Sequence, residues 1–131
     1  MKRILVLGGS GFIGSHVCEK ASALSCRVTV PTRRMVNARS VQSLPWVDVI
    51  EADIHDETAL TRLAHGHDAV VNLVAILHGD AAAFDHVHVA LVQKLVRACQ
   101  SAGVPRLVHI SALGAAPDAP SLYQRSKAAG E

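Results

Sequence analysis

The stretch GGSGFIG, residues 8–14, decides how this sequence folds. It directly follows an apolar run, residues 4–7, and precedes a segment in which apolar side chains recur at helical spacing. Gly8 allows a tight turn, Gly11 lets backbone N–H groups approach a pyrophosphate, and Gly14 lets a helix pack closely on a strand. A glycine-rich turn on its own is common, but one placed between a buried strand and a helix predicts a dinucleotide-binding turn.

The residues of this turn are the predicted phosphate contacts. The helix that follows begins with unpaired backbone N–H groups and a partial positive charge, and both favour an anion. A turn with a purely structural purpose is the alternative. We expect cofactor contacts from the turn and from the first helical turn: Gly8, Ser10, Gly11, Phe12, Ile13 and Gly14.

Strand and helix patterns alternate through the rest of the chain. Apolar runs typical of buried parallel strands predict strands at 4–7, 27–30, 47–50, 69–75 and 107–110, the second of them ended by Pro31. Helices are predicted after the glycine turn, within 37–44, over 56–66 and over 84–102, and a last one begins at Ser121. The first of these presents Phe12, Ile13, Val17, Ala21 and Leu24 on its apolar side.

This alternation predicts an α/β fold of the Rossmann type. Strands separated by helices imply right-handed crossovers, and therefore a doubly wound parallel sheet in three layers with strand order 3-2-1-4-5. Residues 1–131 form one NAD(P)-binding domain. Because the helix from Ser121 has barely begun where the sequence stops, we expect the C-terminal part of the fold to be missing.

Composition excludes several other classes of protein. Net charge is +2 with no basic stripe, and aromatic residues make up 3%, which argues against a nucleic-acid partner. The three cysteines show no CxxC spacing, as expected of reduced thiols in the cytoplasm. The chain carries no apolar stretch of about 18 residues, so we expect no transmembrane segment. The eight histidines lack ligand spacing, and no metal site is predicted.

The end of the second predicted strand favours NADP(H) over NAD(H). Proteins that prefer NAD place an acidic residue there, about 20 residues past the glycines, to bind the ribose 2′-hydroxyl. This chain has Arg33 and Arg34 instead, and a guanidinium pairs two oxygens of a 2′-phosphate at once. A solvent-facing basic loop is the alternative, and NAD(H) stays possible.

Two further segments are expected to lie along the cofactor. Asp53 and Ile54 follow the third strand, where such folds contact the adenine, although an aspartate there is equally suited to cap a turn. The end of the fourth strand, with Leu73, Val74 and Ala75, is expected to form the floor beneath the central riboses.

Tyr123 and Lys127 resemble an acid–base pair. They stand at i and i+4, on one face of the helix that Ser121 begins. A phenol is a poor acid–base group at neutral pH, and a nearby ammonium favours the phenolate by lowering its pKa. Lys127 is also expected to bind the nicotinamide ribose. Ser111, at the end of the fifth strand, is expected to share a substrate oxygen with Tyr123.

Together these segments resemble the short-chain dehydrogenase/reductase superfamily. The matching stretches are GGSGFIG, VTVPTRR, VVNLVAILHG, GVPRLVHISALGA and YQRSK. The likeness is to the extended and atypical branch with the NAD-dependent epimerase/dehydratase family, and within it to bacterial relatives of the NADPH-binding accessory subunit of respiratory complex I. It implies NADP(H) binding and a longer chain with a substrate domain that is absent here.

Two functions follow from these expectations. The first is an NADP(H)-dependent oxidoreductase, epimerase or dehydratase that acts on an unknown small-molecule substrate with Ser111, Tyr123 and Lys127 as catalytic residues. The second is a non-catalytic accessory or assembly subunit that acts through protein contacts. The expected location is the cytoplasm, or the periphery of the inner membrane through a respiratory-complex partner, and the edge at residues 107–110 suits a homo-oligomer.

Overall fold

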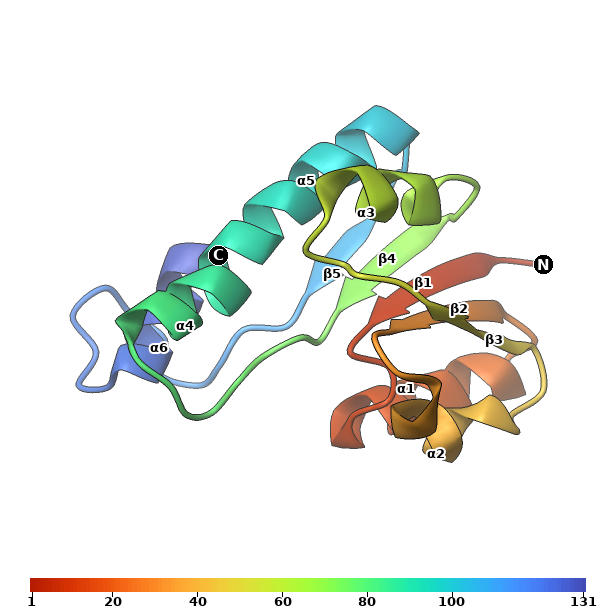
Figure 1. The fold of residues 1–131 in the computed structure, drawn as a ribbon, viewed down its shortest axis with the longest axis horizontal. Helices are drawn as coiled ribbons and strands as arrows, with labels where there is room; N and C mark the ends of the chain where they lie inside the picture. Colours follow the sequence, from red (N-terminus) through yellow and green to blue (C-terminus); the bar gives the residue numbers. More distant parts are fainter.

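A computed structural model describes all 131 residues and contains a five-stranded sheet with helices on both faces (Figure 1). The sheet order is β3-β2-β1-β4-β5, and every neighbouring pair is parallel. The predicted doubly wound topology and strand order are therefore confirmed. None of the helices has the length and apolar character that a bilayer crossing requires.

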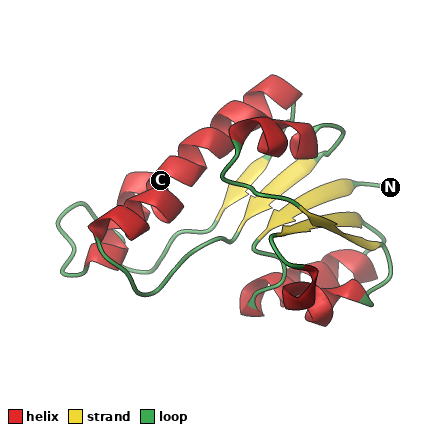
Figure 2. Cartoon of the chain, viewed as in Figure 1, coloured by secondary structure: helices red, strands yellow, loops and turns green.

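The elements alternate along the chain as the sequence predicted (Figure 2). The strands are β1 (Arg3–Leu7), β2 (Arg27–Thr32), β3 (Val47–Glu51), β4 (Ala69–Asn72) and β5 (Leu107–His109). The helices are α1 (Phe12–Ala23), the 3₁₀ helix η1 (Met35–Ala38), α2 (Arg39–Gln42), α3 (Glu57–Ala64), α4 (Ala81–Asp85), the π-helix η2 (His86–Ala90), α5 (Leu91–Ala102) and α6 (Leu122–Gly130). Helices α1 and α2 cover one face of the sheet, and α3 and α5 cover the other (Figure 1).

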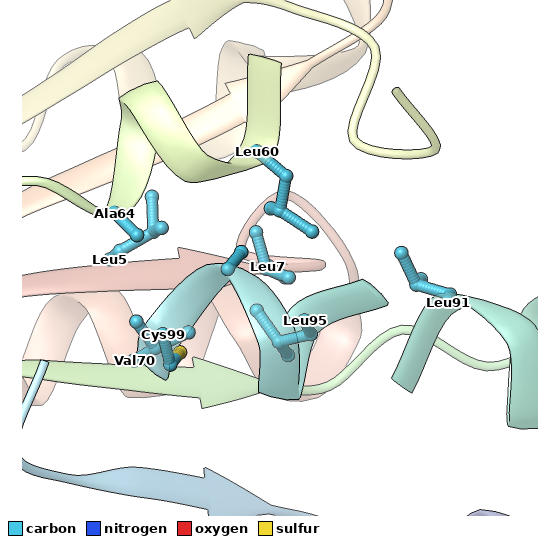
Figure 3. Close-up of a cluster of buried hydrophobic side chains, with 9 residues drawn as sticks. Leu5, Leu7, Leu60, Ala64, Val70, Leu91, Leu95 and Cys99 are labelled. Atoms are coloured by element: carbon cyan, nitrogen blue, oxygen red, sulfur yellow. The ribbon is translucent and has the colours of Figure 1, made fainter. Parts of the chain in front are cut away.

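Two hydrophobic clusters, one on each face, hold the three layers together. On the α3–α5 side, Leu5 and Leu7 of β1 pack against Leu60 and Leu95 (Figure 3). On the α1–α2 side, Val6 packs with residues of α1 and β2. Each fully buried aliphatic side chain contributes roughly 1.5–3 kcal/mol relative to exposure. Strand β1 is thus buried on both sides, as its continuous apolar run predicted.

Strand β2 runs through Pro31, so the prediction that Pro31 ends it was wrong. The N–H of Val28 donates to Trp46 O, and Thr32 O accepts from Ala52 N, which turns the bonding groups of these residues toward β3. Because alternate residues of a strand bond to opposite neighbours, the nitrogen of Pro31 faces the β1 side. There the last β1–β2 pair is Leu5 with Thr29, so the missing N–H leaves no ladder bond unmade.

The predicted apolar face of α1 was wrong in part: Ala21 lies in the core and Val17 packs against it, but the three larger side chains do not. Phe12, Ile13 and Leu24 are 83%, 58% and 78% exposed. Besides Ala21, the helix buries two other small side chains and a glycine, namely Cys18, Ser22 and Gly14. A Cβ at Gly14 would collide with the carbonyl oxygen of Gly8. Small residues on this face let the helix approach the glycine turn and the sheet closely.

Strand β4 is shorter than predicted, because its last residue redirects the chain. The Oδ1 of Asn72 accepts the N–H of Val74 at 3.2 Å, a local bond that replaces the next ladder position. The N–H of Leu73 still donates to Leu7 O at 2.9 Å, and the chain leaves the sheet as a loop from Val74 on. Farther on, the predicted long helix is interrupted by the π-turn of η2 and ends at Gly103, whose φ of 72° is the left-handed conformation expected of a C-cap.

Candidate functional site

The glycine turn lies at the carboxyl end of β1, against the end of β4. Gly8 has a φ of 79°, and a Cβ there would stand 3.1 Å from the carbonyl carbon of Leu73 and 3.2 Å from the nitrogen of Val74. The N–H of Gly11 donates to Gly8 O at 3.1 Å, closing the turn. The structure thus brings the predicted phosphate turn and two of the predicted floor residues into contact, with Ala75 exposed just beyond them.

The N-terminus of α1 is open to an anionic group. Its N-cap, Gly11, has extended backbone and provides no side-chain cap, and the first turn carries no acidic residue. The first N–H groups of a helix have no intrahelical acceptor. Ser10 is half-buried beside them, while Phe12 and Ile13 are exposed. An uncapped, acid-free helix start beside a glycine turn suits a phosphate, so the residues present fit a dinucleotide.

Two cavities lie beside Arg33, past the ends of β2 and β3. The larger, of about 290 Å³, is lined by residues from four segments: Pro31, Thr32, Arg33, Ala52, Ile54, His55, Val74, Ile76 and Val87. The smaller, of about 280 Å³, is lined by Arg33, Glu51, Ala52 and Asp53. Arg33 borders both cavities and is exposed.

The two predicted arginines are placed differently. Arg34 is the N-cap of η1, and its carbonyl oxygen accepts the hydroxyl of Thr32 at 3.0 Å. Arg34 lines neither of the two cavities beside Arg33. Of the two arginines, Arg33 is therefore the one that lines these cavities.

Asp53 lines the smaller cavity and Ile54 lines the larger one. The Oδ1 of Asp53 also accepts the N–H of His55 at 3.0 Å, so its carboxylate caps a turn, the second of the two uses considered for it. No sequence pattern pointed to His55, which stacks on His86 with ring centroids 4.2 Å apart. Burial, followed by the nearby charges of His86 and Arg33, lowers the pKa of His55, so its imidazole is neutral at the cavity wall.

The second part of the site is formed by α6. This helix packs beside α4 at the end of the loops that leave β4 and β5 (Figure 1). Ser121 caps it as predicted, since its hydroxyl accepts the N–H of Gln124 at 3.0 Å. The ring of Tyr123 lies edge-on to Phe84 and His88, with centroids 6.3 and 5.4 Å away.

Lys127 and Ser111 already have protein partners. Lys127 is 3% exposed, and its Nζ donates to Ile110 O at 2.8 Å. Burial lowers the pKa of its ammonium, an effect that the nearby Glu131 carboxylate opposes. The hydroxyl of Ser111 donates to the Glu131 carboxylate. The polar contacts of Ser111 and Lys127 are therefore with Glu131 and Ile110, not with Tyr123.

His88 is a residue of this region that the sequence did not reveal. It is 1% exposed, and both ring nitrogens are bonded, Nε2 to the Ile76 N–H at 3.1 Å and Nδ1 to the Ser126 hydroxyl at 2.8 Å. Its partners lie 12 and 38 residues away, so spacing carries no signal of them. Burial, followed by the charge of Lys127, lowers the pKa of His88 to about 4.

Comparisons with a family model, with known sequences and with solved structures agree with one another. The model of the NAD dependent epimerase/dehydratase family matches residues 4–131. The chain is 28% identical to mouse NADH dehydrogenase [ubiquinone] 1 alpha subcomplex subunit 9, mitochondrial, over 96% of the chain and 35% of that protein. It is 31% identical to dTDP-glucose 4,6-dehydratase of Streptomyces niveus, over 98% of the chain and 47% of that protein.

A solved structure agrees with these relatives. A dTDP-glucose 4,6-dehydratase double mutant from Streptomyces venezuelae, with NAD and DAU bound, superposes with a TM-score of 0.85 at 29% identity. The match covers 98% of this chain and 49% of that one. The chain thus spans less than half the length of each of these relatives.

Proposed function

We propose that this chain, which belongs to the NAD dependent epimerase/dehydratase family, binds NADP(H) as the nucleotide domain of an oxidoreductase, epimerase or dehydratase of the short-chain type. The observation that carries the proposal is the uncapped start of α1 at a glycine turn, with Arg33 on the neighbouring cavities. The backbone N–H groups of α1 would hold the pyrophosphate, and Ile54 and Val74 would border the adenosine half.

Arg33 supports NADP(H) over NAD(H). Its guanidinium is exposed on both cavities and forms no ion pair with an acidic side chain within 4 Å, so its donors are free for a 2′-phosphate. Glu51 and Asp53 line the smaller cavity as well, and their carboxylates are the groups that would oppose a phosphate there. A charge-assisted bidentate bond contributes roughly 1.5–3 kcal/mol, which favours the phosphorylated cofactor.

In the catalytic form of the proposal, three side chains act on an unidentified small-molecule substrate. A bound cofactor would supply hydride-transfer chemistry, and the substrate would lie beside Tyr123. Tyr123 would give or take the proton at its hydroxyl oxygen, and Lys127 would anchor the nicotinamide ribose. An ammonium has three donors, so the bond from Lys127 to Ile110 leaves two of them for a ligand. Because the Ser111 hydroxyl donates to Glu131, Ser111 would accept a hydrogen bond from the substrate.

A non-catalytic accessory subunit is the second candidate. The observation in its favour is that Ser111 and Lys127 are both already bonded to protein groups, an arrangement that strengthens α6 without any substrate. The 28% identity to a mitochondrial NADH dehydrogenase subunit is in line with it. In that case the bound nucleotide would stabilise the domain, and a partner protein would set its location.

Nuclear magnetic resonance tests the binding proposal directly. On titration of the ¹⁵N-labelled chain with NADPH, the amide signals of Gly11, Phe12 and Ile13 are expected to shift and saturate together. The amide of Gly103, the C-cap of α5, is the internal control, and its signal should not shift. If the α1 amides do not respond to millimolar NADPH, the proposed site is wrong.

A further inference from the structure

We infer that His88 is a positioning residue that fixes Tyr123 by tying α6 to the loop after β4 and to η2. The inference rests on the proposed function, because it gives the reason why Tyr123 needs a fixed position. Nothing in the spacing of the sequence marks His88. The argument comes from its bonds, its ring contacts and the turn that carries it.

The hydrogen bonds of His88 admit one tautomer. The N–H of Ile76 is a donor only, so Nε2, 3.1 Å away, must be the unprotonated acceptor. The ring proton is therefore on Nδ1, which donates to the Ser126 hydroxyl at 2.8 Å. Ser126 in turn donates to the carbonyl oxygen of Tyr123 at 2.9 Å. A directed chain of three hydrogen bonds thus runs from the loop after β4 through His88 and Ser126 to the backbone of Tyr123.

The ring of His88 also holds the tyrosine side chain. The two rings are edge-to-face, at an interplanar angle of 79° and a centroid distance of 5.4 Å. Phe84, one turn earlier, contacts both rings. Such pairs contribute beyond the area they bury, and they fix ring orientation. His88 therefore positions both the backbone and the side chain of Tyr123.

The π-turn of η2 brings His88 to this position. The extra residue of a π-turn re-aims the side chains around it, and such turns gather at functional sites. On the partner helix, a Cβ at Gly130 would collide with the carbonyl oxygen of His88. Helix α6 therefore meets η2 at backbone contact, along the face that carries Tyr123, Ser126 and Lys127. Lys127 and His109 are the charged and titratable groups near the imidazole, and both favour its neutral form.

The test uses the single tyrosine of the chain as its probe. In the 131-residue protein with ¹³C-labelled tyrosine, we expect the ring signals of Tyr123 to lie away from those of free tyrosine. In His88→Gln, which keeps hydrogen-bonding groups but lacks the ring, they should move toward the free values. His78→Gln, at an exposed histidine, is the matched control and should leave them unchanged. Histidine ¹⁵N shifts should show Nε2 of His88 unprotonated.

A second readout separates positioning from general support of the fold. With His88→Gln, affinity for 2′,5′-ADP, which spans only the adenosine half, should change less than about twofold. The shift of the Tyr123 signals on saturation with NADP⁺ should be lost. If the response of Tyr123 to NADP⁺ is the same in His88→Gln and wild type, the inference is overturned.

Two further outcomes keep the inference separate from the proposed function. If His88→Gln does not fold, Ser126→Ala replaces it, and unchanged tyrosine signals in Ser126→Ala would overturn the inference. In the last outcome, the ring signals of wild-type Tyr123 do not shift when NADP⁺ binds, but His88→Gln moves them toward the values of free tyrosine. The proposed catalytic site would then fail, and the positioning of Tyr123 by His88 would be supported.

Discussion

The buried ammonium of Lys127 donates a hydrogen bond to the carbonyl oxygen of Ile110, 2.8 Å away, and so ties α6 to the end of β5. The contact joins the helix that carries Tyr123 to the segment that carries Ser111. It also leaves Lys127 two donors at the same point. Whether those donors hold a ribose can be measured.

Replacing Lys127 by methionine is expected to weaken NADP⁺ binding roughly tenfold, because a charge-assisted bond of about 1.5–3 kcal/mol is lost while the apolar stem remains. Isothermal titration calorimetry measures the change. Lys20→Met, at an exposed lysine of α1, is the control. Equal affinities in the two variants would mean that Lys127 serves only the fold.

Replacing Tyr123 by phenylalanine distinguishes the two candidate functions. The ring contacts with Phe84 and His88 persist, and only the transferable proton disappears. We expect turnover to be abolished in any assay in which the wild-type protein is active, with NADP⁺ affinity changed less than about twofold. A Tyr123→Phe protein that functions normally would favour the accessory-subunit candidate.

Gly14 and Gly11 give a matched pair at the glycine turn. A Cβ at Gly14 would collide with Gly8 O, whereas one at Gly11 would meet nothing closer than 3.4 Å. Gly14→Ala is expected to lower the free energy of unfolding by at least about 1–3 kcal/mol, the usual cost of overpacking. Gly11→Ala, on extended backbone, should change it by less than about 1 kcal/mol. Urea unfolding of both variants measures the difference, and equal losses would contradict the close approach of α1 to the turn.

Stability is expected to fall in mild acid because of His88. Its pKa is about 4 in the folded chain and about 6.5 when unfolded, so the unfolded state takes up a proton first as the pH drops. The stabilisation is complete above pH 6.5 and is lost progressively between pH 6.5 and 4, on the order of 3 kcal/mol. His55, His67 and His109 also have lowered pKa values and act in the same direction.

Urea unfolding at pH 7 and pH 4.5 measures this dependence. His88→Gln removes the titrating group and should reduce the difference in the free energy of unfolding between the two pH values, whereas His78→Gln should leave that difference unchanged. If the difference is the same in His88→Gln as in the wild type, the pH dependence of stability comes from the other histidines.

Much of the fold followed from local patterns, and the errors have physical causes. The order of strands and helices and the caps at Asp56, Gly103 and Ser121 depend on short-range chemistry that the sequence displays. The buried face of α1 followed only in part, because the closeness of the glycine turn favours small side chains such as Ala21 over large apolar ones such as Phe12. Pro31 is tolerated in β2 because its nitrogen lies past the last bonded pair with β1.

Less of the candidate site than of the fold could be predicted from the sequence. The glycine turn, Arg33 and the floor residues lie together because parallel strands end at one edge of the sheet, a rule that sequence reasoning can apply. His88 depends on a π-turn and on partners brought in by tertiary packing. The bond from Ser111 to Glu131 likewise joins residues 20 positions apart.

Calorimetric comparison of NADPH with NADH tests the central claim most directly. Wild type is expected to bind NADPH at least about tenfold more tightly. Arg33→Ala should remove that preference, and Arg34→Ala, at an arginine that lines neither cavity, should retain it. Equal affinity of the wild type for the two nucleotides, or an unchanged preference in Arg33→Ala, would contradict the assignment of Arg33 to the 2′-phosphate.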